Sequence, residues 1–120
     1  MDSKEIKELI QVYFDANYET DANKITKVFH ENANVYGHDE KGNYGHMDKT
    51  AFLKLIDSLP ADPSVPRKDE LLSLDFIGGN AAVARVRIRM GNMIYTDILN
   101  FIRLDGKWGI VTKIYSGTLA

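Results

Sequence analysis

Apolar residues recur every three or four positions in three segments of the first sixty residues, and this spacing predicts amphipathic helices. The first predicted helix carries its apolar face on Ile6, Leu9, Ile10 and Tyr13. A shorter second helix is predicted to follow a cap at Thr20 or Asp21. A third is capped by Asp48, carries Phe52 on its apolar face and ends at Pro60.

From residue 71 onward the pattern changes to alternation with a period of two, which is typical of β-strands. Turns rich in glycine and asparagine at 78–80, 91–92 and 105–106 separate four strands, at 71–77, 81–90, 93–104 and 107–115. A shorter pair is predicted at 34–38 and 44–47. Helices followed by an antiparallel meander predict an α+β fold, in a single domain that covers residues 1–120.

The composition excludes several kinds of chemistry and of partner. The 120 residues are 44% hydrophobic and 27% charged, with a net charge of −2 and no cysteine. Disulfides and thiolate chemistry are therefore excluded, and there is no positive field to gather nucleic acid. The sequence contains no run of 18 apolar residues, so no membrane span is predicted. The charged N-terminus is unlike a signal peptide, and we therefore expect a cytoplasmic protein.

Asp97 interrupts an apolar strand, and strand register predicts which face it occupies. The turn at 91–92 places Val86 opposite Asp97, and the turn at 105–106 places Ile114 opposite it. Both registers put Asp97 on the inward face, together with Tyr95 and Trp108. An inward carboxylate needs a partner, a raised pKa or a hydrated cavity.

The residues leave two interpretations of Asp97 open. A backbone amide, a tyrosine hydroxyl or Arg103 could satisfy it as a structural group. Alternatively, it lies in a pocket as an acid, a base or a polar anchor.

The opposite, outward face of the predicted sheet is too apolar for open solvent. The same registers place Arg85, Arg87 and Arg89 on that side, and also Lys113, outside any pocket. The apolar outward set consists of Ile94, Thr96, Ile98, Ile102, Val111 and Tyr115.

Five segments together resemble the NTF2-like superfamily, in its SnoaL-like and ketosteroid-isomerase-like branches, and most closely the group named "putative lumazine-binding". They are Tyr13-Phe14, the segment 28–33, Tyr95-Thr96-Asp97, the segment 105–108 and Lys113-Ile114-Tyr115. The resemblance implies a cone in which a curved antiparallel sheet wraps around the helices and encloses a pocket. It also implies a homodimer through the outer face of the sheet.

The resemblance carries over to individual residues only in part. Tyr13 matches a helix tyrosine that donates to an oxyanion in isomerase-like members. The position of their general base falls on Gly37, which cannot move a proton, and this argues against steroid-isomerase chemistry.

The three histidines, His30, His38 and His46, raise the alternative of a metal site with Asp97 as a fourth ligand. If the turn is 41–43, His38 and His46 are cross-strand neighbours on one face; if Asp39 pairs with Tyr44, they point to opposite faces. His30 is predicted in the turn after the second helix. We predict no metal and no cofactor.

Three functions compete at this point. The first is a binding protein for a small, largely apolar or aromatic molecule. The second is an enzyme of isomerase, hydrolase or dehydratase type with Asp97 and Tyr13 as catalytic groups. The third is a dimeric interaction module. The predicted pocket residues are Tyr13, Gly37, His46, Phe52, Tyr95, Asp97 and Trp108, and no nucleic-acid or membrane partner is expected.

Overall fold

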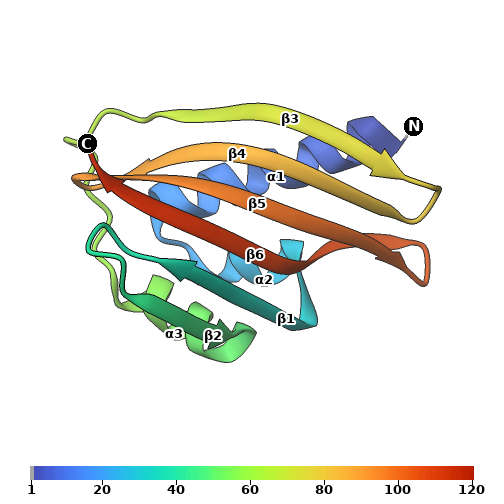
Figure 1. Cartoon of the computed structure of the whole chain (residues 1–120), viewed down its shortest axis with the longest axis horizontal. Coiled ribbons are helices and arrows are strands. Elements are labelled where there is room, and N and C mark those ends of the chain that lie inside the picture. The colour runs from blue at the N-terminus through green and yellow to red at the C-terminus, as the bar shows by residue number, and fades with distance from the viewer. Residues whose placement is uncertain (1) are drawn as a thin grey trace.

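The computed structural model describes residues 2–120, which form three helices and one six-stranded sheet (Figure 1). The helices are α1 (Asp2–Glu19), α2 (Ala22–Val28) and α3 (Lys49–Ser58). The strands are β1 (Phe29–His38), β2 (Tyr44–Asp48), β3 (Asp69–Ile77), β4 (Ala81–Met90), β5 (Met93–Leu104) and β6 (Lys107–Leu119). The predicted α+β class is confirmed.

The sheet has the strand order β2-β1-β6-β5-β4-β3. Neighbouring strands are antiparallel, except that β1 and β6 run parallel. The sheet curves, and Figure 1 shows the helices together behind one of its faces. Helix α1 crosses behind β4 and β6, and α3 lies behind β1 and β2. The other face has no helix over it in this view.

Two predicted helix caps are confirmed. The Asp21 carboxylate accepts hydrogen bonds from the backbone N–H groups of Asn23 (3.0 Å) and Lys24 (3.3 Å). Asp48 accepts one from Ala51 at 2.8 Å. These bonds satisfy N–H groups that a helix start leaves unpaired.

Strand β1 begins at Phe29, five residues earlier than the predicted 34–38. The prediction placed His30 in a turn, whereas His30 lies within β1 and its Nε2 is 2.9 Å from the carbonyl oxygen of Ile102. The early start reflects the parallel contact with β6, which a local pattern of residues does not reveal.

The predicted register between β4 and β5 is confirmed, with Met90 opposite Met93 and Val86 opposite Asp97. Between β5 and β6 the predicted register holds only as far as Phe101 and Ile110. A β-bulge then leaves Val111 unpaired, and Asp97 lies opposite Tyr115 instead of the predicted Ile114. One extra residue on a strand exchanges its two faces beyond the bulge.

Because of the bulge, three of the predicted side-chain directions are wrong. Lys113, predicted to face outward, is buried, and Tyr115, also predicted to face outward, packs against the core. Ile114, predicted to face inward, is 47% exposed on the outer face.

Gly37 is required where β1 meets β6. A Cβ atom at this position would overlap the ring and the backbone oxygen of Tyr115. Backbone cannot yield as a flexible side chain does, so β1 and β6 would have to separate.

We therefore expect Gly37→Ala to lower the free energy of unfolding by about 3 kcal/mol or more, the upper part of the range for overpacking. Gly79→Ala is the matched control, because a Cβ there meets nothing within 4 Å. Urea unfolding of both variants measures the difference. Equal stabilities would show that the β1–β6 contact is looser than described.

Candidate functional site

The carboxyl group of Asp97 is fully buried near the middle of β5. The Tyr13 hydroxyl donates a hydrogen bond of 2.5 Å to its Oδ2 atom, joining α1 to the sheet. Its other oxygen, Oδ1, is buried without a hydrogen-bond partner among the described residues. Of the partners proposed from the sequence, the tyrosine hydroxyl is the one present. Arg103 instead lies 3.4 Å from Asp2.

Lys113 brings an amine into the same interior. The residue is 6% exposed, and its Nζ atom is 3.7 Å from Asp97 Oδ2. This distance is within ion-pair range but too long for a good hydrogen bond. The amine lies 4.6 Å from the centre of the Phe52 ring and 5.3 Å from that of Tyr13.

Burial shifts the pKa of each group in this cluster. Loss of hydration raises the pKa of Asp97, although Lys113 and Tyr13 oppose the shift. It lowers the pKa of Lys113, although Asp97 opposes that shift. It also raises the pKa of Tyr13, with a further contribution from the Asp97 charge, so the hydroxyl stays protonated. All three shifts favour the uncharged forms.

An inner cavity of about 120 Å³ adjoins the amine. Lys113 is the one charged side chain among the described residues that line it. Its walls come from α3, the inner face of the sheet and the end of α1. The remaining lining residues are Asn17, Val35, Met47, Phe52, Leu55, Ile56, Leu59, Ile88, Met90, Tyr95 and Tyr115.

An outer pocket of about 350 Å³ shares Asn17, Leu59, Met90 and Tyr95 with the inner cavity. Its other walls include Tyr18, the segment 60–65 and Arg89. The inner cavity is smaller than the roughly 300–1,000 Å³ of drug-sized sites, whereas the outer pocket falls within that range. The two hollows are therefore neighbours, and Lys113 lines the inner one.

Asn17 stands at the junction of these two hollows and is 3% exposed. Its Nδ2 group donates to the Tyr13 carbonyl at 2.8 Å. Its Oδ1 atom is buried and accepts no hydrogen bond from the described residues. A buried acceptor in this position favours a ligand that carries a hydroxyl or N–H donor.

Four predicted site residues gather here. Tyr95 and Phe52 line the inner cavity. Tyr13 and Asp97 lie one layer deeper and reach the cavity through Lys113, which contacts both.

The other three predicted site residues lie elsewhere. Gly37 packs beneath Tyr115, and His46 stacks on Tyr36 on the outer face, with ring centres 4.7 Å apart. Trp108 packs against Phe76, with its ring edge-to-face at 6.0 Å, and does not line the inner cavity.

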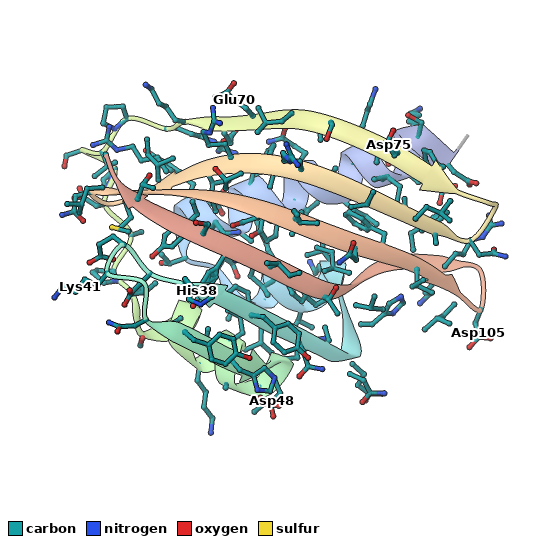
Figure 2. All side chains as sticks on the ribbon, viewed as in Figure 1. His38, Lys41, Asp48, Glu70, Asp75 and Asp105 are labelled. Atoms are coloured by element: carbon teal, nitrogen blue, oxygen red, sulfur yellow. The ribbon has the colours of Figure 1, made fainter. Side chains whose placement is uncertain are left out.

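The histidine register agrees with the first predicted alternative in that His38 and His46 share one face, although they do not lie directly opposite each other. His38 pairs with Tyr44 and Tyr36 pairs with His46, so both histidines share the outer face. Figure 2 shows His38 at one edge of the sheet, with Glu70 and Asp75 of β3 at the opposite edge. Asp97 faces inward, away from the histidines. Within residues 2–120, no group of three histidine or acidic side chains is placed to hold a metal ion.

Lys113, Tyr115 and Asn17 line the cavity, but the sequence pattern did not predict them there. Lys113 and Tyr115 face the cavity because of the bulge. The sequence signal for the bulge is Ile110-Val111, where two β-branched residues stand side by side and strict alternation would place one. Asn17 follows Tyr13 by four positions on α1, which places both on one helix face. That spacing could have identified it.

Comparison with known proteins gives the family and supports the fold. Residues 1–116 match a family described as "Putative lumazine-binding". An NTF2-like protein of unknown function from Shewanella baltica OS155 superposes with a TM-score of 0.88, at 23% identity over 99% of this chain and 95% of that one. One from Methylobacillus flagellatus KT gives 0.84, at 24% identity over 97% and 91%.

The chain has the fold of these NTF2-like proteins, as the sequence resemblance predicted. It belongs to the "Putative lumazine-binding" family. A curated relative, "Aldolase FrzH" from Cladobotryum sp, is 25% identical over 105 residues, which are 86% of this chain and 81% of the relative.

Removing either member of the Asp97–Lys113 pair should lower the free energy of unfolding, because the other member then remains buried without it. We expect Lys113→Met and Asp97→Asn each to lower the free energy of unfolding by about 3 kcal/mol near neutral pH. The double variant should lose less than the sum of the two single changes. Urea unfolding of all four proteins measures this coupling. Additive losses would contradict it.

The Lys113→Met variant should also respond to pH. The folded-state pKa of Asp97 lies above its ordinary value of 3.8. A proton on Asp97 therefore contributes stability that is fully present below that value and is lost as the pH rises through the folded-state pKa. We expect Lys113→Met to lose more stability than the wild type as the pH rises above that ordinary value, measured by urea unfolding at a series of pH values.

Proposed function

We propose that this protein binds a small, largely apolar carbonyl compound in the inner cavity. The observation that carries the proposal is a single buried amine at the end of an apolar hollow, with a carboxyl group and a phenol behind it. A carbonyl oxygen is the acceptor that such an amine would bind. The apolar walls match a hydrocarbon or aromatic body, and Asn17 would accept a hydrogen bond from a polar group nearer the mouth.

Catalysis is the second candidate, and two observations favour it. The Asp97 carboxyl has a raised pKa and lies within reach of a second polar group, Lys113. The aldolase relative acts, by its name, in carbonyl chemistry. Aldol and isomerisation reactions share one step, the removal of a proton from the carbon next to a carbonyl. The cluster contains the groups to hold the carbonyl oxygen and move that proton.

The Asp97–Lys113 pair can serve this step without a change in net charge. As the ammonium ion of the pair, Lys113 would donate a proton to the carbonyl oxygen while negative charge develops on it. The free amine would then take the proton from the neighbouring carbon and pass it to the Asp97 carboxylate, which Tyr13 would keep in place. Exclusion of water from the cavity strengthens each of these interactions.

Binding and catalysis can be tested together with a small ketone such as cyclohexanone, and lumazine as a second ligand. We expect the ketone to raise the melting temperature of the wild type and of Lys107→Met, an exposed control. Lys113→Met should lose that shift. Deuterium uptake next to the carbonyl, followed by NMR in D₂O, should fall by about 100-fold in Asp97→Asn.

The outcomes separate the candidates. A thermal shift without deuterium exchange would support binding and oppose catalysis. If neither ketone nor lumazine shifts the melting temperature, the carbonyl pocket is wrong.

The partner proposed for the outer face of the sheet is a second copy of the chain. Ile98 and Ile114 lie directly opposite each other on β5 and β6, and Ile114 is 47% exposed. Arg85 and Arg87 pair with Ile98 and Thr96 on the adjacent strand and border this apolar centre. Such a surface, apolar at its centre and charged at its rim, is typical of interfaces.

We expect the wild type to have the mass of a dimer in light scattering, and Ile98→Glu to have that of a monomer, because a carboxylate at the apolar centre of the interface would have to lose its hydration. Leu104→Glu is the control, since Leu104 lies at the β5–β6 turn and is already 52% exposed. A monomeric wild type would refute this interface.

A further inference from the structure

The amine of Lys113 is a nucleophile as well as a hydrogen-bond donor. We propose that Lys113 forms a covalent imine with the carbonyl carbon of an aldehyde or ketone in the inner cavity. This inference rests on the proposed carbonyl pocket and gives its lysine a chemical role.

The first support is the position of the amine. The Lys113 side chain lines the cavity, and its nitrogen lies among the rings of Phe52, Tyr13 and Tyr115, at 4.6, 5.3 and 6.0 Å from their centres. A lysine reacts with carbonyls only as the free amine, which an apolar pocket favours over the ammonium ion. The walls also limit the water that would hydrolyse the product.

The second support is the carboxyl group behind the amine. Asp97 Oδ2 is 3.7 Å from the nitrogen, near enough to exchange a proton with it, and it already accepts the Tyr13 hydrogen bond. Asp97 Oδ1 is buried and has no partner among the described residues, so it offers a place for the proton. The proton of the pair can therefore rest on Asp97 while the amine is free.

The reaction balances within these groups. The nitrogen lone pair attacks the carbonyl carbon, the C=O π bond breaks, and one N–H proton moves to the oxygen to give a carbinolamine. The nitrogen then forms the C=N bond while the hydroxyl leaves as water, taking the proton that Asp97 held. The products are a protonated imine on Lys113, an Asp97 carboxylate and one water molecule. Nothing is oxidised or reduced.

The protonated imine would suit this interior better than a free ammonium ion. Its positive charge is spread over carbon and nitrogen and faces the same aromatic rings. The Asp97 carboxylate formed in the same step becomes its counter-ion, so the cluster remains neutral overall. A proton on the neighbouring carbon becomes more acidic in such an imine, which links this adduct to the proposed proton transfer.

Reductive trapping tests the proposal. Purified protein is incubated with cyclohexanone and sodium cyanoborohydride near neutral pH, and intact mass and peptide mapping follow. We expect one cyclohexyl group per chain, located at Lys113. Adducts spread over exposed lysines at equal rates, or no adduct, would overturn the imine.

Variants separate chemistry from folding. Lys113→Arg keeps a cation in the cavity without a reactive amine and should form no adduct, whereas Lys107→Met should form as much as the wild type. Asp97→Asn should trap the ketone about 100-fold more slowly while the ketone still raises its melting temperature. Undiminished trapping in Asp97→Asn would remove Asp97 as the proton donor.

The imine and the carbonyl pocket can fail separately. A ketone that raises the melting temperature of the wild type but is never trapped would refute the imine and leave the pocket standing. A ketone that neither shifts the melting temperature nor is trapped would refute both.

Discussion

The interior of this protein is organised around one constraint, that the carboxyl group of Asp97 cannot be buried alone. Tyr13 meets part of the requirement through its hydrogen bond, and Lys113 meets the rest by bringing an amine to ion-pair distance. The first contact ties α1 to the centre of the sheet, and the second ties β6 to β5. The cavity lies beside these contacts because α3 and the end of α1 close over the amine without filling the space in front of it.

The bulge in β6 makes this arrangement possible. With regular pairing, Lys113 would face outward and Ile114 would complete an apolar interior around a carboxyl group that had Tyr13 as its partner but no amine. The single unpaired residue at Val111 exchanges the faces of the following segment, so a lysine and a tyrosine enter the interior and an isoleucine leaves it. The same irregularity thus supplies both the polar group of the cavity and an apolar residue of the outer face. Bulges are common where a strand must redirect a functional side chain.

Much of this could be read from the sequence because it depends on local rules. The caps at Asp21 and Asp48 follow from side-chain chemistry, and the β4–β5 register follows from a short glycine turn, so all were correct. The inward direction of Asp97 followed from the same turn. Features that depend on distant parts of the chain were missed. Strand β1 starts early because it pairs with β6, and Lys113 turns inward because of a bulge set by packing. Trp108 was assigned to the pocket by alternation alone, which gives a face of the sheet but not a position along it.

The parallel pairing of β1 with β6 has a consequence for the order in which the molecule can be made. Residues near position 35 pair with β2 on one side, but on the other side their partners lie near position 113, in a strand that follows every other strand of the sheet. Contacts between such distant segments form slowly, because a long loop must close first. During synthesis, the helices and the β3–β5 meander emerge before the segment that completes the cavity. The nascent chain therefore has no ligand site until β6 emerges and inserts between β1 and β5.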